Sequence, residues 1–427
     1  MTTTAPPEGT EHTEAPGEPG RGGLAVFGDA AREYASRLRG GDVGALPAVL
    51  GLLALFVVFT ALRPNRFTTP FNFANLVHQS AAVIVIAMGL IFILLLGEID
   101  LSAGYTAGTA AAVMGIVVTQ RGWPWWIAVI ACLVTGAVVG TVIGWLVARL
   151  GIPSFVVTLA AFLGLQGVLL KLIGEGGTIS IRDETLVAIN NDDLPVLLGW
   201  LVCLVTIAGY AWVSLRRTAV RRAAGLQHTA LPVALTRIAL VAALLVAGTA
   251  YLSIERSPNP NVTSLRGVPI VVLLLLVLLV GLNFVLTRTS FGRHVYAVGG
   301  NAEAARRAGI NVWRVKLTCF MISSTLAATA GILLASRDNS ISPTTGGADT
   351  LLYAVGAAVI GGTSLFGGKG RVVDAVLGGL VIGVIINGMG LLSQPSSVVY
   401  MVTGLVLLVA ASVDALSRRR AASTGRL

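Results

Sequence analysis

The sequence of 427 residues contains little charge, cysteine or histidine. Only 12% of its residues are charged, three are cysteines and four are histidines. Cys132, Cys203 and Cys319 lie in separate apolar stretches, outside any Cys-x-x-Cys pair, so neither a disulfide framework nor a zinc site is expected. We expect the three thiols to be small groups buried in the protein core.

The sequence also lacks the common enzyme motifs, with no His-Glu-x-x-His, Gly-x-Ser-x-Gly or Gly-x-Gly-x-x-Gly pattern. The stretch GGTSLFGGKGR (361–371) superficially suggests a phosphate-binding loop. However, Thr363 stands where its first glycine belongs, and Gly370 stands where a Ser or Thr would hold magnesium. We therefore expect no enzyme, no metal and no bound cofactor, and any ATP hydrolysis would belong to a separate partner.

Long apolar segments dominate what is present. Hydrophobic residues make up 55% of the chain, and many segments are long enough to cross the ~30 Å of bilayer hydrocarbon as a helix. A β-barrel would instead show short alternating segments. The sequence predicts an all-α, polytopic integral membrane bundle of about twelve transmembrane helices, over 44–62, 77–96, 103–119, 125–149, 154–173, 194–215, 231–254, 268–287, 315–336, 349–366, 372–392 and 398–413.

The net charge of +10 comes mostly from short loops between these segments, a distribution that orients a membrane protein and does not indicate nucleic acid binding. If both termini are cytoplasmic, the basic loops all fall inside, while the loops at 182–195 and 255–267 carry acids, Pro and Asn and fall outside. We expect a multi-pass cell-membrane protein surrounded by membrane lipid.

Three parts are expected along the chain. Residues 1–43, rich in Thr, Pro, Gly and Glu, cannot bury enough surface to fold and are predicted to be a disordered cytoplasmic tail. Residues 44–415 form the transmembrane domain, and 416–427 form a basic cytoplasmic tail.

One loop, 288–314, contains the pattern of a short, capped helix. Asn301 suits the N-cap, Glu303 the first turn, Arg306 and Arg307 the last turn, and Gly309 the C′ position. A helix of about seven residues does not persist alone in water. It must pack on a partner, which is either its own neighbouring spans, as in an ordinary connector, or a second protein.

Glycines at helical spacing mark two predicted spans: Gly136, Gly140 and Gly144 on one, Gly379 and Gly383 on another. Such faces allow helix backbones to approach closely in lipid. We expect tight helix packing at both faces. The alternative is that they line a path for a small solute.

Several ordered stretches resemble the permease subunits of ribose-type ABC importers, in the branched-chain amino acid/ribose permease family. The C-terminal half carries GRHVYAVGGNAEAARRAGINVWRVK (292–316), AAVIGGTSLFGGKGRV (357–372) and IINGMGLL (385–392). The N-terminal half carries LLGEIDLSAG (95–104) and GIPSFVVTLAAFLGLQGVLL (151–170). The resemblance extends from about residue 44 to residue 415.

Within that family the sequence is similar to the xylose-type branch. The features that carry this similarity are an extra pair of spans around RRTAVRRAAGLQ (216–227), the stretch RGVPIVVLLL (266–275), and the acid Glu98 in place of a second glycine. Gly97 departs from that branch, whose members have alanine there.

The resemblance implies a type II-like ABC importer permease for a monosaccharide, D-xylose or another pentose. It implies a homodimer, an extracytoplasmic sugar-binding protein, and a cytoplasmic ABC ATPase that docks on a coupling helix made of Gly300, Asn301, Glu303, Ala304, Ala305, Arg306 and Gly309. Two alternatives stay open: an ABC permease for branched-chain amino acids or nucleosides, and a secondary sugar transporter. The latter would need relay carboxylates deep in several spans.

Two places in the predicted spans are candidates for the substrate pathway. In GEIDLSAG, Asp100 with Ser102 could cap a helix that begins at Leu101, or Glu98 and Asp100 could accept hydrogen bonds from sugar hydroxyls. Capping does not explain Glu98. Asn387 could likewise form an interhelical hydrogen bond or contact substrate.

Overall fold

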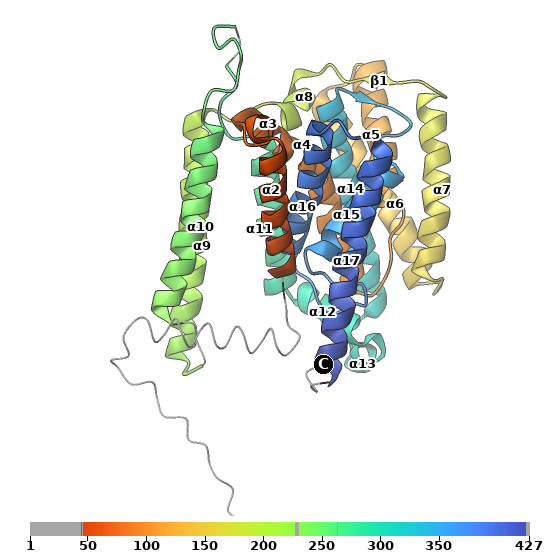
Figure 1. Ribbon diagram of the computed structural model, residues 1–427. Coiled ribbons are helices and arrows are strands. Elements are labelled where there is room, and N and C mark those ends of the chain that lie inside the picture. Colours follow the sequence, from red (N-terminus) through yellow and green to blue (C-terminus); the bar gives the residue numbers. More distant parts are fainter. Residues whose placement is uncertain (1–43, 45, 227–229, 263, 424–427) are drawn as a thin grey trace, which may run out of the picture.

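The structure, a computed structural model, describes residues 44, 46–226, 230–262 and 264–423. The predicted tail at 1–43 and residues 424–427 lie outside this part. The described chain is a helical bundle with one two-stranded sheet (Figure 1). Its elements are α2 (Leu46–Leu62), α3 (Pro64–Phe67), α4 (Pro70–Leu95), α5 (Ala103–Gly115), the π-helix η1 (Ile116–Gln120), α6 (Trp125–Ala148), α7 (Ser154–Ile173), β1 (Ile179–Ser180), α8 (Glu184–Asn191), α9 (Val196–Ala223), α10 (Leu231–Leu252), α11 (Ile270–Arg288), α12 (Ser290–Gly300), α13 (Ala302–Arg307), α14 (Val312–Asp338), β2 (Ser340–Ile341), α15 (Ala348–Ile360), α16 (Val372–Leu391) and α17 (Ser396–Ser423).

The all-α membrane fold is confirmed, and each of the twelve predicted spans falls on a helix. In the described residues, eight helices are both long and apolar enough to cross a membrane: α4, α6, α7, α9, α10, α11, α14 and α16. The apolar parts of α2, α15 and α17 are shorter. The number of twelve spans therefore stays a prediction.

Proline sets the start of many of these helices. Pro70 occupies the first turn of α4, whereas Pro124, Pro153, Pro195 and Pro269 each stand at the N-cap of the helix that follows. Proline suits these positions because the amide it lacks would have no partner inside the helix. The helix boundaries thus follow from local chain chemistry.

The centre of the bundle is formed by α4, α14 and α16, and the predicted glycine faces pack against two of them. On α6, a Cβ at Gly136 or Gly140 would lie 2.5 Å from the carbonyl oxygen of Ser324 or Phe320, both on α14. On α16, a Cβ at Gly383 would lie 1.9 Å from the Ser80 hydroxyl oxygen of α4. The predicted tight packing is confirmed, and the three cysteines are buried and free, as expected.

The span predicted at 349–366 is wrong in its last third, residues 361–366. The helix α15 ends at Ile360, and the glycine-rich stretch 361–371 that follows is a loop. Thirteen residues of helix extend only about 20 Å, which is less than the thickness of the hydrocarbon. Glycines at 361, 362, 367 and 368 remove the side-chain packing and helix propensity that a continued helix would need.

Two helices, α5 and α15, begin side by side inside the bundle. A Cβ at Gly104 in the first turn of α5 would lie 2.4 Å from the carbonyl oxygen of Gly346, just before α15. The helices run to opposite ends: η1, which continues α5, reaches β1 through a 2.8 Å bond from Thr119 Oγ1 to the Ser180 carbonyl oxygen, whereas α15 ends near the start of α16. This arrangement of two discontinuous helices was not predicted.

Other segments also differ from the prediction. The loop expected at 182–195 contains the helix α8, whose N-cap Asp183 accepts a hydrogen bond from the Leu186 amide at 3.1 Å. The helix α17 continues to Ser423, so part of the predicted basic tail from residue 416 is helical.

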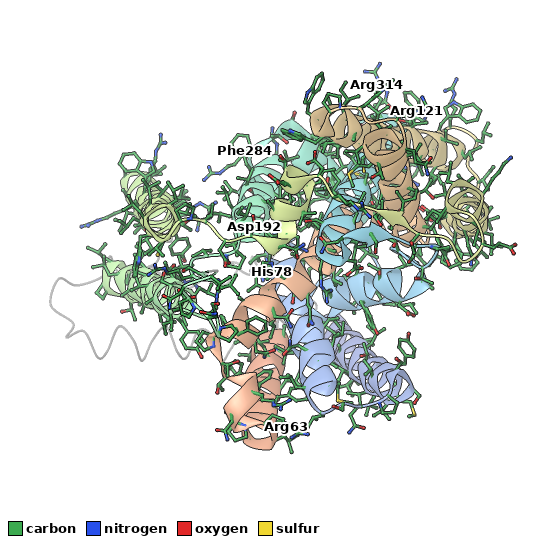
Figure 2. All side chains as sticks on the ribbon, turned by 90° about the horizontal axis from the view of Figure 1, so that it is seen from above. Arg63, His78, Arg121, Asp192, Phe284 and Arg314 are labelled. Carbon is green, nitrogen blue, oxygen red and sulfur yellow. The ribbon has the colours of Figure 1, made fainter. Side chains whose placement is uncertain are left out.

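The hairpin of α9 and α10 stands apart from the rest of the bundle, as both views show (Figures 1 and 2). In the described residues, the hairpin is joined to the bundle at its base, the end formed by the start of α9 and the end of α10. There Arg256 forms an ion pair with Asp193, and the Gly267 amide donates to the Leu252 carbonyl oxygen at 3.0 Å. Tyr251 donates to the Thr68 carbonyl oxygen and packs edge-on against the ring of Phe73.

Candidate coupling surface and interior polar site

The predicted capped helix is present as α13, and its caps are confirmed. Asn301 Oδ1 accepts from the Ala304 amide at 2.9 Å, and Gly309 adopts φ +84°, where other residues are strained. The Gly309 and Ile310 amides donate to the carbonyl oxygens of Arg306 and Ala305, both at 3.0 Å, which is a Schellman motif. The sequence therefore encodes the helix and both of its ends.

Only one of the predicted coupling side chains faces the protein. Ala305 is buried against the core, while Gly300, Asn301, Glu303, Ala304, Arg306 and Gly309 are exposed. Glu303 pairs with Arg306 at 3.1 Å and Arg307 at 3.4 Å, but such exposed pairs contribute little stability. The helix thus rests on its alanine face and presents a charged face outward.

The preceding helix α12, which was not predicted, sits against the end of α4. A Cβ at Gly299 would lie 1.8 Å from the Leu95 carbonyl oxygen, and the same oxygen accepts from the Gly368 amide at 2.9 Å. Tyr296 donates to the Gly370 carbonyl oxygen at 2.8 Å. The glycine-rich stretch 361–371, which is not a phosphate loop, therefore packs beside the predicted coupling helix.

Glu98 forms an ion pair with Lys316, which lies in the second turn of α14. Both side chains are partly buried, with 16% and 23% of their surface exposed. Because α14 begins directly after α13, the pair connects the chain that follows α4 to the helix that carries the coupling loop. Lys316 was not singled out from the sequence, although it is the only basic residue within the predicted span 315–336.

Asp100 lies deeper, about halfway along α14, and is 2% exposed. Its Oδ1 accepts from the Ser102 amide at 2.9 Å and the Ser102 hydroxyl at 2.6 Å, and its Oδ2 accepts from the Ser323 hydroxyl at 3.2 Å. The helix begins at Ala103, not at Leu101, so Asp100 holds the turn in front of α5. A buried carboxylate with this many donors is satisfied within the protein.

The chain around Asp100 is fixed by α7 as well. The Ile99 amide donates to Ser154 Oγ at 3.2 Å, and Thr158 Oγ1 donates to the Ile99 carbonyl oxygen, also at 3.2 Å. Ser154 and Thr158 belong to the PSFVVT part of the 151–170 stretch. The two N-terminal stretches that carry the resemblance thus meet at this extended segment.

Asn387 forms the predicted interhelical hydrogen bonds. Its amide exchanges two bonds of 2.9 Å with the amide of Asn72 on α4, and its Nδ2 also donates to Gln79 Oε1 at 3.3 Å. The predicted pathway residues therefore lie at three separate places. Glu98 lies just beyond the C-terminal end of α4, Asp100 and Ser102 lie beside the middle of α14, and Asn387 lies beside the first turn of α4. Ser323, Asn72 and Gln79 were missed because only tertiary contacts distinguish them from other polar residues in apolar helices.

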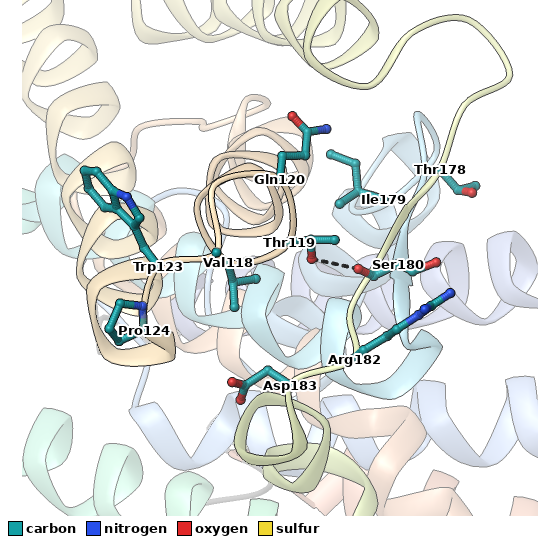
Figure 3. Close-up of a pocket in the computed structure, with 11 residues that line it drawn as sticks. Val118, Thr119, Gln120, Trp123, Pro124, Thr178, Ile179, Ser180, Arg182 and Asp183 are labelled. Carbon is teal, nitrogen blue, oxygen red and sulfur yellow. Dashed lines mark hydrogen bonds between the residues drawn. The ribbon is translucent and has the colours of Figure 1, made fainter.

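At the opposite end of the bundle from α13 lies an open pocket of about 920 Å³ (Figure 3). The π-helix η1 forms one wall, and the strand β1 with its flanking residues forms the other. Polar groups line much of it: Thr119, Gln120, Thr178, Ser180, Arg182 and Asp183. This pocket was not predicted, since its two walls come from segments about sixty residues apart.

Comparison with known proteins decides the family. Residues 72–411 match the family model described as "Branched-chain amino acid transport system / permease component". The chain belongs to this family. As a permease component it is a multi-pass membrane transport subunit and not an enzyme.

Individual relatives agree over nearly the whole length. The chain is 38% identical to the xylose transport system permease protein XylH of Escherichia coli K12, over 87% of this chain and 92% of that protein. It is 34% identical to XylH of Haemophilus influenzae, over 87% and 96%. The ribose import permease protein RbsC of E. coli K12 is 30% identical, over 86% and 92%. No solved structure matches the chain.

Proposed function

We propose that this permease is the transmembrane subunit of an ABC importer for a monosaccharide, D-xylose or a related pentose. The observation that carries the proposal is the 38% identity to a xylose permease across 87% of the chain. The ribose permease is a weaker match, at 30%. Both substrates are pentoses, so the substrate class has more support than the individual sugar.

We infer that α13 is the docking site for a cytoplasmic ABC ATPase. Its exposed charges and its buried Ala305 suit a helix that sits in a cleft of a partner protein. A displacement of this helix would be transmitted directly to α14, which follows it in the chain. It would also be transmitted to the end of α4, through the contact of α12 with Leu95 and through the Glu98–Lys316 pair. This route would carry the energy of ATP hydrolysis into the bundle, which contains no nucleotide motif of its own.

This assignment places both termini and α13 in the cytoplasm, and the pocket between η1 and β1 on the outer side. We propose that a sugar-binding protein delivers its ligand at that outer face, and that two copies of the permease form the transporter. Glu98, Asp100, Ser102 and Asn387 remain candidates for the pathway. The geometry favours a structural role for Asp100, whose oxygens already have three donors, and for Asn387, whose amide is bonded to Asn72 and Gln79.

Reconstitution tests the proposal. Proteoliposomes that contain the permease and its ATPase should accumulate labelled xylose only with ATP and the sugar-binding protein present, and vanadate should stop uptake. Unlabelled ribose and leucine, added at equal excess, test the substrate class. Uptake that responds to a proton gradient instead of ATP would indicate a secondary transporter, and competition by leucine alone would indicate an amino acid permease.

A further inference from the structure

A groove of about 250 Å³ lies between α9 and α10, at the end of the hairpin away from its joined base. Its lining residues share one face of each helix, and three of them are arginines. The residues are Tyr210, Val213, Ser214, Arg217, Thr218 and Arg221 from α9, and Val233, Ala234 and Arg237 from α10.

The groove has a small, polar floor and a positive rim. Ala234 is buried at its base, and Tyr210, Ser214 and Thr218 are half-buried. Arg217 and Arg221, one helical turn apart, and Arg237 on the facing helix are exposed. Three guanidinium groups and three hydroxyls therefore surround one cavity.

In the part of the chain that the structure describes, these arginines have no acidic partner. The sequence from residue 196 to residue 252 contains five arginines and neither aspartate nor glutamate. Among the described residues, no guanidinium group of the three rim arginines forms an ion pair or hydrogen bond, so no described side chain compensates their charge.

Most of the hairpin's apolar surface is exposed. Only 11% of the most apolar window of α9, and 6% of that of α10, is buried in the protein, and large side chains such as Trp212, Leu240 and Leu244 are exposed. No described side chain at 204–222 or 231–245 makes a hydrogen bond or ion pair beyond its own helix. The end that carries the groove is therefore not held by the described part of the bundle, and Figure 1 shows the hairpin standing apart from it.

We propose that this groove binds the phosphate head group of an anionic phospholipid. Guanidinium groups hold phosphate oxygens in paired hydrogen bonds, and basic pockets between transmembrane helices suit such head groups. The phosphate would lie between Arg217, Arg221 and Arg237, with Tyr210, Ser214 and Thr218 as further donors. The acyl chains would lie along the apolar surfaces of α9 and α10, which distinguishes a lipid from a free phosphate ion.

The chain itself offers a matched control. Arg216 and Arg222 lie on the same helix as Arg217 and Arg221 but do not line the groove. The variant Arg217→Gln with Arg221→Gln removes the same charge as Arg216→Gln with Arg222→Gln. The general attraction of anionic lipid to a basic surface, about 1 kcal/mol per arginine, is lost equally in both variants.

Native mass spectrometry of the detergent-solubilised permease, titrated with phosphatidylglycerol and then phosphatidylcholine, measures the site. The wild type should retain phosphatidylglycerol preferentially, and the groove variant should retain about tenfold less of it than the control variant. Arg237→Gln should lower retention in the same direction. Because these side chains are exposed, the midpoint of thermal unfolding without lipid should be unchanged, which separates lost binding from lost folding.

Three results would overturn the proposal. Equal retention by the groove and control variants would mean that the arginines attract lipid only as general charge. Competition by millimolar glycerol phosphate as effective as that by the lipid would indicate a site for a free anion. Loss of a protein dimer, with lipid retention unchanged, would show that a second copy of the chain occupies the groove. None of these results depends on which sugar the permease transports.

Discussion

Two regions of this permease have the same apolar character but opposite surroundings. In α4, the most apolar stretch of 18 residues is 83% buried inside the protein. The corresponding stretch of α10 has nearly the same mean hydropathy but is only 6% buried. Among the eight candidate spans, α11 has the highest hydropathy, yet its most apolar stretch is only 11% buried. Hydropathy thus locates the helices, but it does not distinguish helices that are buried inside the protein from helices at its periphery.

Small residues explain the difference. Lipid tails are as apolar as leucine, so close packing and interhelical hydrogen bonds, rather than hydrophobicity, decide which helices associate. The glycines of α6 and α16 meet backbone or side-chain atoms of α14 and α4, whereas a Cβ at Gly209 of α9 or Gly248 of α10 would meet no atom within 4 Å. Close packing therefore requires glycine at these core positions but not at Gly209 or Gly248.

The largest effect should come from enlarging a core glycine. Gly140→Leu should prevent α6 from packing on α14, because a Cβ there would lie 2.5 Å from the Phe320 carbonyl oxygen and 2.8 Å from Met321 Cα. We expect a loss of about 3 kcal/mol or more. Gly209→Leu in the hairpin should change stability by less than about 0.5 kcal/mol. The yield of monodisperse protein and the thermal unfolding midpoint in detergent measure the effect of each variant. Equal values for the two variants would contradict the distinction between core and hairpin glycines.

The next test concerns the charged helix at the inner end of the core. Glu303→Lys and Gly309→Pro should each abolish uptake in the reconstituted transporter while leaving membrane insertion intact. The first reverses a charge that faces the proposed ATPase. The second places proline at φ +84° and removes the amide that donates to Arg306. Glu175→Lys, the same charge change at an exposed site just after α7, is the control. Normal uptake by both α13 variants would make the loop a connector.

A smaller effect is expected at Asp100. Asp100→Ala leaves the Ser102 amide and the Ser102 and Ser323 hydroxyls without their acceptor and should cost about 1–3 kcal/mol. Asp100→Asn can still accept from Ser102 and donate to Ser323, so most of the stability should return. Thermal unfolding of both variants gives the comparison. If Asp100→Asn folds normally but blocks uptake, the carboxylate has a transport role beyond holding the turn.

The ion pair between Glu98 and Lys316 should contribute less to stability, about 1 kcal/mol, because water still reaches both side chains. Its effect should be clearer in transport. Glu98→Gln and Lys316→Gln should each lower sugar uptake relative to ATP hydrolysis, and the exchange of the two charges in one variant should restore part of it. Unchanged uptake in both single variants would exclude the pair from the coupling route.

The smallest effect is expected at the base of the hairpin. Glu255 accepts hydrogen bonds from the Ser264 hydroxyl at 2.6 Å, the Leu265 amide at 2.8 Å and the Ser257 amide at 3.1 Å. These bonds lower the pKa of Glu255 from its ordinary value of 4.5 to about 2. A lowered folded-state pKa stabilises the loop above pH 4.5, and this contribution is lost as the pH falls toward 2.

Hydrogen exchange at the Leu265 amide, corrected for intrinsic rates, should therefore show constant protection from pH 8 to about 4.5 and less protection below that. Glu255→Gln should remove the pH dependence. Protection that falls between pH 8 and pH 6 would point to a different titrating group at the hairpin base.

The sequence by itself determined the membrane class, the approximate positions of the long apolar helices, the glycine faces and the caps of α13. These features depend on interactions between residues close in the chain: twenty apolar residues suffice for a span, and Asn301 and Gly309 act within one short helix. Tertiary structure decided that α5 and α15 begin side by side inside the bundle, that Lys316 pairs with Glu98, and that α9 and α10 stay largely unburied by the rest of the protein. Each of these features depends on which helices, distant in the sequence, pack against one another. In lipid that choice follows from how closely the helix surfaces fit, and hydropathy contains no information about this fit.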